Sequence, residues 1–158
     1  MTRLEFVLTG IIGLTSAIVP TAVVAQTGAR GITGAAEATF SNNATFNSVP
    51  LRGLTLGEGI FIATDGSATG QFQAVLLGTS PLGTPRNITV EGEVRNGSVG
   101  EDGSAIISGT ATVNMGDGTL PLLGVPFTVT GSTQSLGLTL GVTVLPTAAV
   151  TAGSITIE

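Results

Sequence analysis

Two glutamates at alternate positions are the residues of this sequence whose spacing best suits acid–base chemistry. Glu91 and Glu93 lie in Asn87–Arg95, where the alternate positions are Ile88, Val90, Gly92 and Val94. Carboxylates two positions apart on a strand share a face at roughly 6–7 Å, which is near the spacing used in glycoside hydrolysis. A catalytic acid needs burial to raise its pKa, however, and Arg95 can neutralise a solvated face. We therefore interpret the pair as a solvated strand face and predict no enzymatic activity.

Threonines provide a second candidate surface. Within Gly103–Gly131, Thr110 and Thr112 alternate with apolar residues in the first half, and Thr128 and Thr130 do so in the second half. Rows of hydroxyls on a sheet can contact a polysaccharide or a neighbouring subunit, so polysaccharide binding and self-association are the candidate partnerships. Threonine is also a good strand former that needs no partner, which is the simpler interpretation. These four threonines are the candidate ligand-contact residues.

Several acidic residues stand beside glycine in turn-like segments, notably Asp65, Asp102 and Asp117. Calcium binds through carboxylate and carbonyl oxygens, but these residues do not form the spaced series of acidic ligands that a calcium loop requires. Aspartate also stabilises turns through its own side chain. The sequence therefore predicts turns here, with no metal site and no cofactor.

Missing residue types exclude several kinds of chemistry. The 158 residues contain no Cys, His, Trp or Tyr, and all five basic residues are arginine. Without His or Cys there is no Ser–His or Cys–His nucleophile pair and no zinc site of the usual kind. Without Lys there is no Schiff base. The net charge of −5, with scattered arginines, argues against binding to nucleic acid.

The first 25 residues resemble a secretory signal peptide in their pattern. An apolar run from Phe6 to Val19 is followed by Pro20 and by small residues up to Ala25, which predicts cleavage before Gln26. An uncleaved anchor is the alternative, but a membrane span needs about 20 continuous apolar residues and Pro20 interrupts this run. We expect a secreted protein (periplasmic, extracellular or on the cell surface) with no transmembrane span after cleavage.

Alternating apolar and polar residues predict the elements that carry these side chains. We expect a flexible leader over 26–35 and a single β domain over 36–158. Its fold should be all-β, a single antiparallel β-sandwich or partly closed barrel of about eight short strands, preceded by a cleaved signal helix. Such a domain is expected to be non-catalytic, with a structural or surface-interaction role. The alternatives are a carbohydrate-binding module with a Thr/Asn-rich face and a self-assembling extracellular subunit.

Local patterns add more specific expectations. Residues 41–50 are polar and are predicted to form a loop, and Asp65-Gly66 predicts a hairpin turn that would let Phe61 and Phe72 meet. Asn96-Gly97 is a strong hairpin dipeptide and predicts a turn, which either ends the strand or leads into a return strand that continues through a bulge.

The segment from Leu122 to Gly131 should place Leu123, Val125, Phe127 and Val129 on its core face. Within it, Pro126 cannot donate a ladder hydrogen bond, which predicts an edge, a bulge or a register break nearby.

Overall fold

The computed structural model describes residues 28–158, which form one antiparallel sheet of nine strands. The strands are β1 (Arg30–Phe46), β2 (Val49–Ile62), β3 (Ser67–Thr79), β4 (Pro85–Val99), β5 (Ala105–Asn114), β6 (Leu122–Gly131), β7 (Ser135–Leu140), β8 (Thr143–Val144) and β9 (Ala148–Ile157). The all-β prediction is confirmed, but the strands belong to one sheet and not to the two of a sandwich. The signal peptide proposed for residues 1–25 lies outside the described residues. No helix in the described part of the chain is long and apolar enough to cross a membrane.

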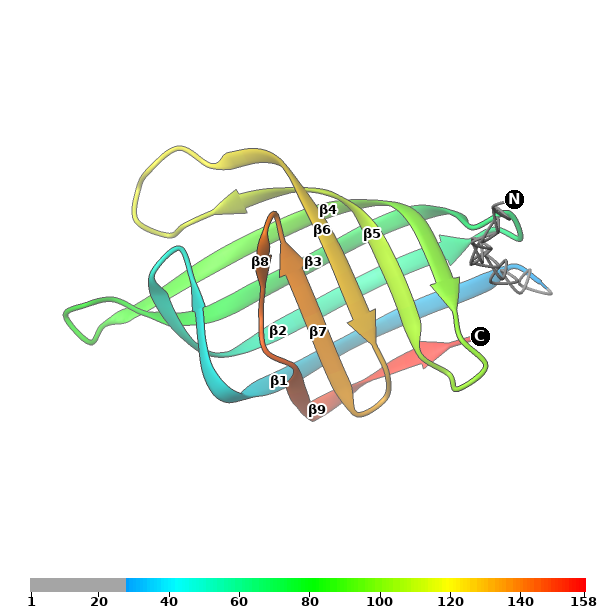
Figure 1. Cartoon of the computed structure of the whole chain (residues 1–158), viewed down its shortest axis with the longest axis horizontal. Helices are drawn as coiled ribbons and strands as arrows, with labels where there is room; N and C mark the ends of the chain where they lie inside the picture. The colour runs from blue at the N-terminus through cyan, green and yellow to red at the C-terminus, as the bar shows by residue number, and fades with distance from the viewer. Residues whose placement is uncertain (1–27) are drawn as a thin grey trace, which may run out of the picture.

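The sheet curls until its two ends meet (Figure 1). Strands β1 to β6 pair in chain order, β9 lies on the other side of β1, and β7 connects β9 to β6. Strand β7 pairs with β6 over five residue pairs but with β9 over only two, Ser135–Ala149 and Leu136–Ala148. We call the junction between β9 and the β6–β7 pair the seam. The closure is therefore incomplete, and the sheet is not a regular barrel.

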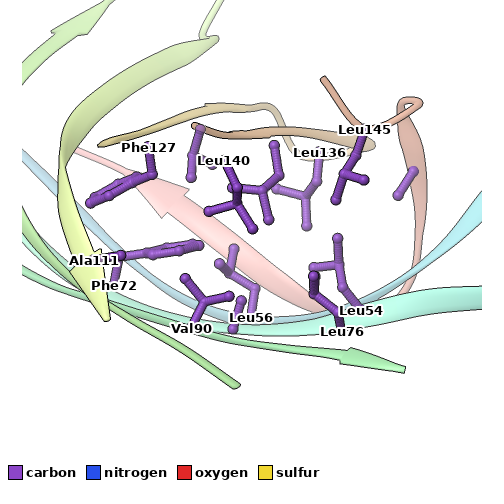
Figure 2. Packing of buried hydrophobic residues seen from close by; sticks show 14 of the residues in the cluster. Leu54, Leu56, Phe72, Leu76, Val90, Ala111, Phe127, Leu136, Leu140 and Leu145 are labelled. Carbon is purple, nitrogen blue, oxygen red and sulfur yellow. The ribbon is translucent and has the colours of Figure 1, made fainter. Parts of the chain in front are cut away.

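Apolar side chains from the inner face of the sheet fill its interior. Figure 2 shows leucines of β2 and β3 pointing toward leucines of β7. The rings of Phe72 and Phe127 stack across this interior, with centroids 5.1 Å apart and planes 18° apart. The largest fully buried side chains are those of Phe72, Ile32, Ile62, Leu76, Ile88, Leu140, Val90 and Val113. One continuous core thus connects the two walls of the curled sheet.

The first hairpin is longer than the sequence suggests. Residues 30–35, expected in a flexible leader, already belong to β1. The loop predicted over residues 41–50 is wrong, because β1 continues to Phe46 after a register shift between Thr39 and Ala44. The turn consists of Asn47 and Ser48, whose φ angles are +45° and +65°. Positive φ at both central residues matches the right-handed twist of the flanking strands, so a two-residue turn is enough.

Three hairpin turns share the sequence Asp-Gly-Ser or Asp-Gly-Thr. Each aspartate carboxylate accepts hydrogen bonds from the backbone N–H and the hydroxyl of the residue two positions on. The pairs are Asp65 with Ser67, Asp102 with Ser104, and Asp117 with Thr119. The hairpin predicted at Asp65-Gly66 is confirmed, and its side chain stabilises the turn that the sequence predicts.

Two irregularities decide which way side chains face. Strand β4 runs through Asn96-Gly97 with a register shift after Val94, so the turn predicted there is wrong and the irregularity is a bulge within one strand. In the β2–β3 hairpin, Phe61 is 55% exposed while Phe72 is buried. The expected contact between these rings is wrong because Phe61 pairs with Thr69 on the outer face.

Strand β6 slips near its start. Leu123 was expected in the core but is 78% exposed. The register with β5 shifts between Ala111 and Val113, and Gly124 has φ +66°. A shift of one residue moves side chains to the opposite face of a strand, which explains the exposed leucine. The irregularity predicted from Pro126 is therefore confirmed.

Candidate functional site

Glu91 and Glu93 lie on the outer face of β4, between polar side chains of both neighbouring strands. Antiparallel pairing places a glutamine of β3 on one side of each glutamate and a threonine of β5 on the other. The two resulting rows are Gln73–Glu91–Thr112 and Gln71–Glu93–Thr110. We call these six residues the polar rows. Directly opposite residues on adjacent strands have Cβ atoms about 4.5–5.5 Å apart, so one extended ligand could touch all three strands.

A hollow of about 490 Å³ opens over the polar rows. Its lining residues are Gln71, Phe72, Gln73, Glu91, Gly92, Glu93 and Thr112. Because the side chain of Phe72 is buried in the core, the exposed walls are mostly amide, carboxylate and hydroxyl groups together with their aliphatic stems. Beyond the glutamines, the outer positions of β2 are Gly57 and Gly59, and nothing lies within 4 Å of a Cβ built on either. The hollow is therefore shallow and open toward β2.

The carboxylates of the hollow are exposed to solvent. Glu93 lies 3.7 Å from Arg95, with 75% and 63% of the respective side chains exposed, so solvent screens this ion pair strongly. A buried environment of the kind that tunes a catalytic carboxylic acid is missing at both glutamates. The site is better suited to accepting hydrogen bonds from a ligand than to acid catalysis.

The four candidate threonines lie on the outer face in neighbouring rows of β5 and β6. Thr110 and Thr112 belong to the polar rows. Thr128 lies between Ser108 and Thr139 in the next row around the curled sheet, and Thr130 lies between Ile106 and Gly137. The sequence pattern could assign all four to one face, but their grouping depends on the pairing of β6 with β5 and β7.

Sequence reasoning missed Glu58, which faces the interior of the sheet. It is in phase with Leu56 and Ile60 on β2, and its cross-strand neighbours are Gly34 and Phe72. Burial raises the pKa of the Glu58 carboxyl to about 7 because desolvation disfavours the charged form. The alternation Leu54, Leu56, Glu58, Ile60, Ile62 is the signal that could have revealed it. Gly57 and Gly59 obscure this signal because they suggest a break between two strands.

Glu58 lines a small cavity at the seam, which we call the seam cavity. Its volume is about 10 Å³, close to the minimum that holds one water molecule. The lining residues are Ile32, Glu58, Ala105, Ile107, Val129, Gly131 and Ile155. Glu58 is therefore the single polar side chain of this lining.

The acidic turns do not form a metal site in the described part of the chain, where no group of three or more His, Cys, Asp or Glu side chains could hold an ion. Hydrogen bonds from Ser67, Ser104 and Thr119 lower the pKa of Asp65, Asp102 and Asp117, respectively. Their carboxylates thus stabilise turns.

The β5–β6 loop has a further contact with β4. Arg86 forms an ion pair with Asp117 and donates a hydrogen bond to the Met115 carbonyl at 3.1 Å. These interactions fix the loop against the start of β4.

The described chain is therefore an all-β domain with two notable sites. The open hollow over the polar rows lies on the outer face of the sheet, and the Glu58 carboxyl lies on the inner face at the seam cavity. No protein-family model, curated protein or solved structure matches the chain. Its function must therefore be argued from the residues themselves.

Proposed function

We propose that this chain is a secreted, non-catalytic β domain that acts by surface contact, and that the polar rows bind a polyhydroxylated polymer. The observation that carries the proposal is the hollow of about 490 Å³ whose exposed walls are polar groups from adjacent strands. Sugar hydroxyls both donate and accept hydrogen bonds. Glutamine offers both functions, glutamate accepts, and threonine does either.

The chemistry of the hollow also indicates which polymers it favours. The chain has no Trp or Tyr, so stacking on large aromatic side chains is not part of the binding surface. Each hydrogen bond contributes only about 0.5–1.5 kcal/mol net, which predicts weak binding per site and a dependence on repeated contacts along a polymer. The carboxylates of Glu91 and Glu93 repel polyanions. Neutral or amine-bearing polysaccharides should therefore bind better than polyuronates.

Binding can be tested by co-sedimentation of the purified domain with an insoluble neutral glucan, with chitosan and with a crosslinked polyuronate. We expect retention on the first two. The double variant Gln71→Ala/Gln73→Ala should reduce retention on both by at least several-fold, whereas Glu37→Gln, on the outer face of β1, should leave it unchanged. The proposal would be overturned if the double variant were retained as well as the wild type. It would also be overturned if no polymer retained the domain when its binding sites were present at millimolar concentration.

Export is a separate part of the proposal and rests on residues 1–25. If the pattern is a signal peptide, the protein recovered outside the cytoplasm should begin at Gln26. N-terminal sequencing of the exported protein tests this directly. A full-length chain retained in a membrane fraction would contradict it.

Self-assembly is the second candidate function, and one observation favours it. Strand β9 pairs with β1 along its length but with β7 at only two positions, so Thr151–Ile157 lacks a strand partner on the seam side within the described residues. This stretch carries no charged residue, and such edges are templates for strand addition. Sedimentation velocity at increasing protein concentration should show association, which Thr156→Lys should weaken. A wild-type monomer at high concentration would exclude it.

A further inference from the structure

We propose that the protonation state of Glu58 controls whether the seam is closed beside the seam cavity. The neutral carboxyl allows the seam to close, and the ionised carboxylate shifts the population toward an open seam that admits water. This inference goes beyond the proposed binding function, which uses the outer face of the sheet.

The seam is held by backbone hydrogen bonds at one end and by side-chain contacts at the other. Backbone bonding between β9 and the β6–β7 region ends near Val150, whose N–H donates to the Gln134 carbonyl at 2.9 Å. Further along β9, closure relies on side chains. A Cβ built on Gly131 would lie 4.0 Å from Cδ1 of Ile155. Apolar contacts of this kind can separate without breaking a hydrogen-bonded ladder.

The surroundings of Glu58 at the seam cavity are apolar. Every element packed around the seam cavity presents only apolar side chains or glycine to it. These groups are Ile32 and Gly34 of β1, Phe72 of β3, Ala105 and Ile107 of β5, Val129 and Gly131 of β6, and Ile155 of β9. None of them is titratable or charged. An ionised Glu58 therefore has neither a counter-charge nor a hydrogen-bond donor among the side chains of this lining.

Ionisation of Glu58 changes how much water its carboxyl group requires. An ionised carboxylate without a partner needs several water molecules, because burying it unpaired is costly. Glu58 is mostly but not fully buried, so water reaches only part of its side chain, and the adjoining cavity of about 10 Å³ has room for one more water molecule at most. Opening at the seam supplies the missing water, and it does so where the sheet is held by the fewest backbone hydrogen bonds.

The pKa of the Glu58 carboxyl sets the pH range over which the seam should open. Burial raises the pKa of Glu58 from 4.5 to about 7 in the closed form, and the open form should return toward the lower value. Closure is then most favourable below about pH 4.5. The ratio of open to closed molecules rises as pH increases to about 7 and levels off above it. A difference of about 2.5 pKa units corresponds to a change of about three-hundredfold in this ratio over the whole window.

Thiol labelling can measure the opening, because the chain contains no cysteine. Ala105→Cys places a small buried reporter in the seam cavity, and Ala44→Cys places one in the core at the opposite end of β1. Labelling rates are divided by that of Thr151→Cys on the exposed side of β9, which corrects for thiolate formation. We expect the normalised rate at Ala105→Cys to rise about a hundredfold between pH 5 and pH 8, with a smaller rise at Ala44→Cys.

Combining the reporters with Glu58→Gln identifies the responsible group. Glutamine keeps the shape without the charge, so the normalised rate should no longer change with pH. Glu37→Gln should leave the pH dependence intact. If Glu58→Gln does not fold, Glu58→Leu serves the same purpose. A wild-type rate that does not change with pH, an equal rise at both reporters, or a dependence that survives in the Glu58 variant would each overturn the proposal.

Discussion

The stacked rings that join the two walls of the sheet depend on a glycine beneath them. Gly92 faces the core on β4, where a Cβ would lie 2.7 Å from Cε1 of Phe127 and 3.0 Å from Cδ1 of Phe72. The rings pack against each other and cannot move apart cheaply. Overpacking of this kind costs about 1–3 kcal/mol. Alanine recovers about 0.4–1 kcal/mol by restricting the unfolded chain, so Gly92→Ala should lower the free energy of unfolding by about 1–2 kcal/mol.

A double-mutant cycle tests whether the ring causes this loss. Phe127→Leu removes the nearest ring atoms and should itself be destabilising, since a stacked aromatic pair contributes about 0.5–1.5 kcal/mol beyond its buried area. In the double variant, the alanine methyl occupies space that the ring has left. The combined loss should therefore be smaller than the sum of the single losses by about 1 kcal/mol. Equilibrium unfolding in urea gives all four free energies, provided that the m-value stays constant.

Gly59→Ala is the matched control for the cycle. Gly59 lies on the outer face of β2, and nothing is within 4 Å of its added Cβ. This variant should be neutral or slightly stabilising. The packing argument would be refuted if Gly92→Ala were as stable as Gly59→Ala, or if the losses from Gly92→Ala and Phe127→Leu were simply additive.

Three further predictions concern charge. Because burial raises the pKa of Glu58 from 4.5 to about 7, the wild-type free energy of unfolding should fall by at most about 3.5 kcal/mol as pH rises through this window, at about 1.4 kcal/mol per pKa unit. Glu58→Gln should remove that slope in urea titrations. The hydrogen bonds from Ser104 lower the pKa of Asp102, so its contribution is present above the usual aspartate range and is lost as pH falls. Asp102→Asn should therefore reduce the acid sensitivity of the melting temperature. Asp117→Ala removes the partner of Arg86 and the acceptor of the Thr119 hydrogen bonds, and it should speed proteolysis of the β5–β6 loop with little effect on global stability.

Local alternation was enough to predict the faces of several strands. Val90 and Val94 are buried on β4 while Glu91 and Glu93 are exposed, as the period of two indicates. This works because the face of a regular strand is a property of neighbouring residues alone. The polar rows could not be assembled in the same way, since they require the register of β4 with both β3 and β5.

Glu58 shows the limit of the local pattern. A carboxylate at a core position contradicts the expected burial of apolar residues, and the flanking glycines weaken the strand signal further. Strand β2 nevertheless continues through Gly57 and Gly59 because β1 and β3 pair with both of its edges. Such support comes from residues distant in sequence, so it is invisible in the segment itself.

The incomplete seam lies beside an irregular stretch of β9 and beside Glu58. The register between β1 and β9 shifts at Glu37 and Ala38, near Gly153, which has φ +82°. A Cβ at Gly153 would lie 2.1 Å from the Ala35 carbonyl oxygen, so only glycine allows this close approach. Bulges of this kind bend the strand that carries them and terminate pairing. Pairing of β9 with β7 ends at Ala149 because its partner Ser135 is the first residue of β7, and the unpaired length of β9 lies beside the cavity that the Glu58 carboxyl faces. Among the described residues, the chain thus places an inward-facing carboxyl beside the stretch where the curled sheet lacks backbone closure.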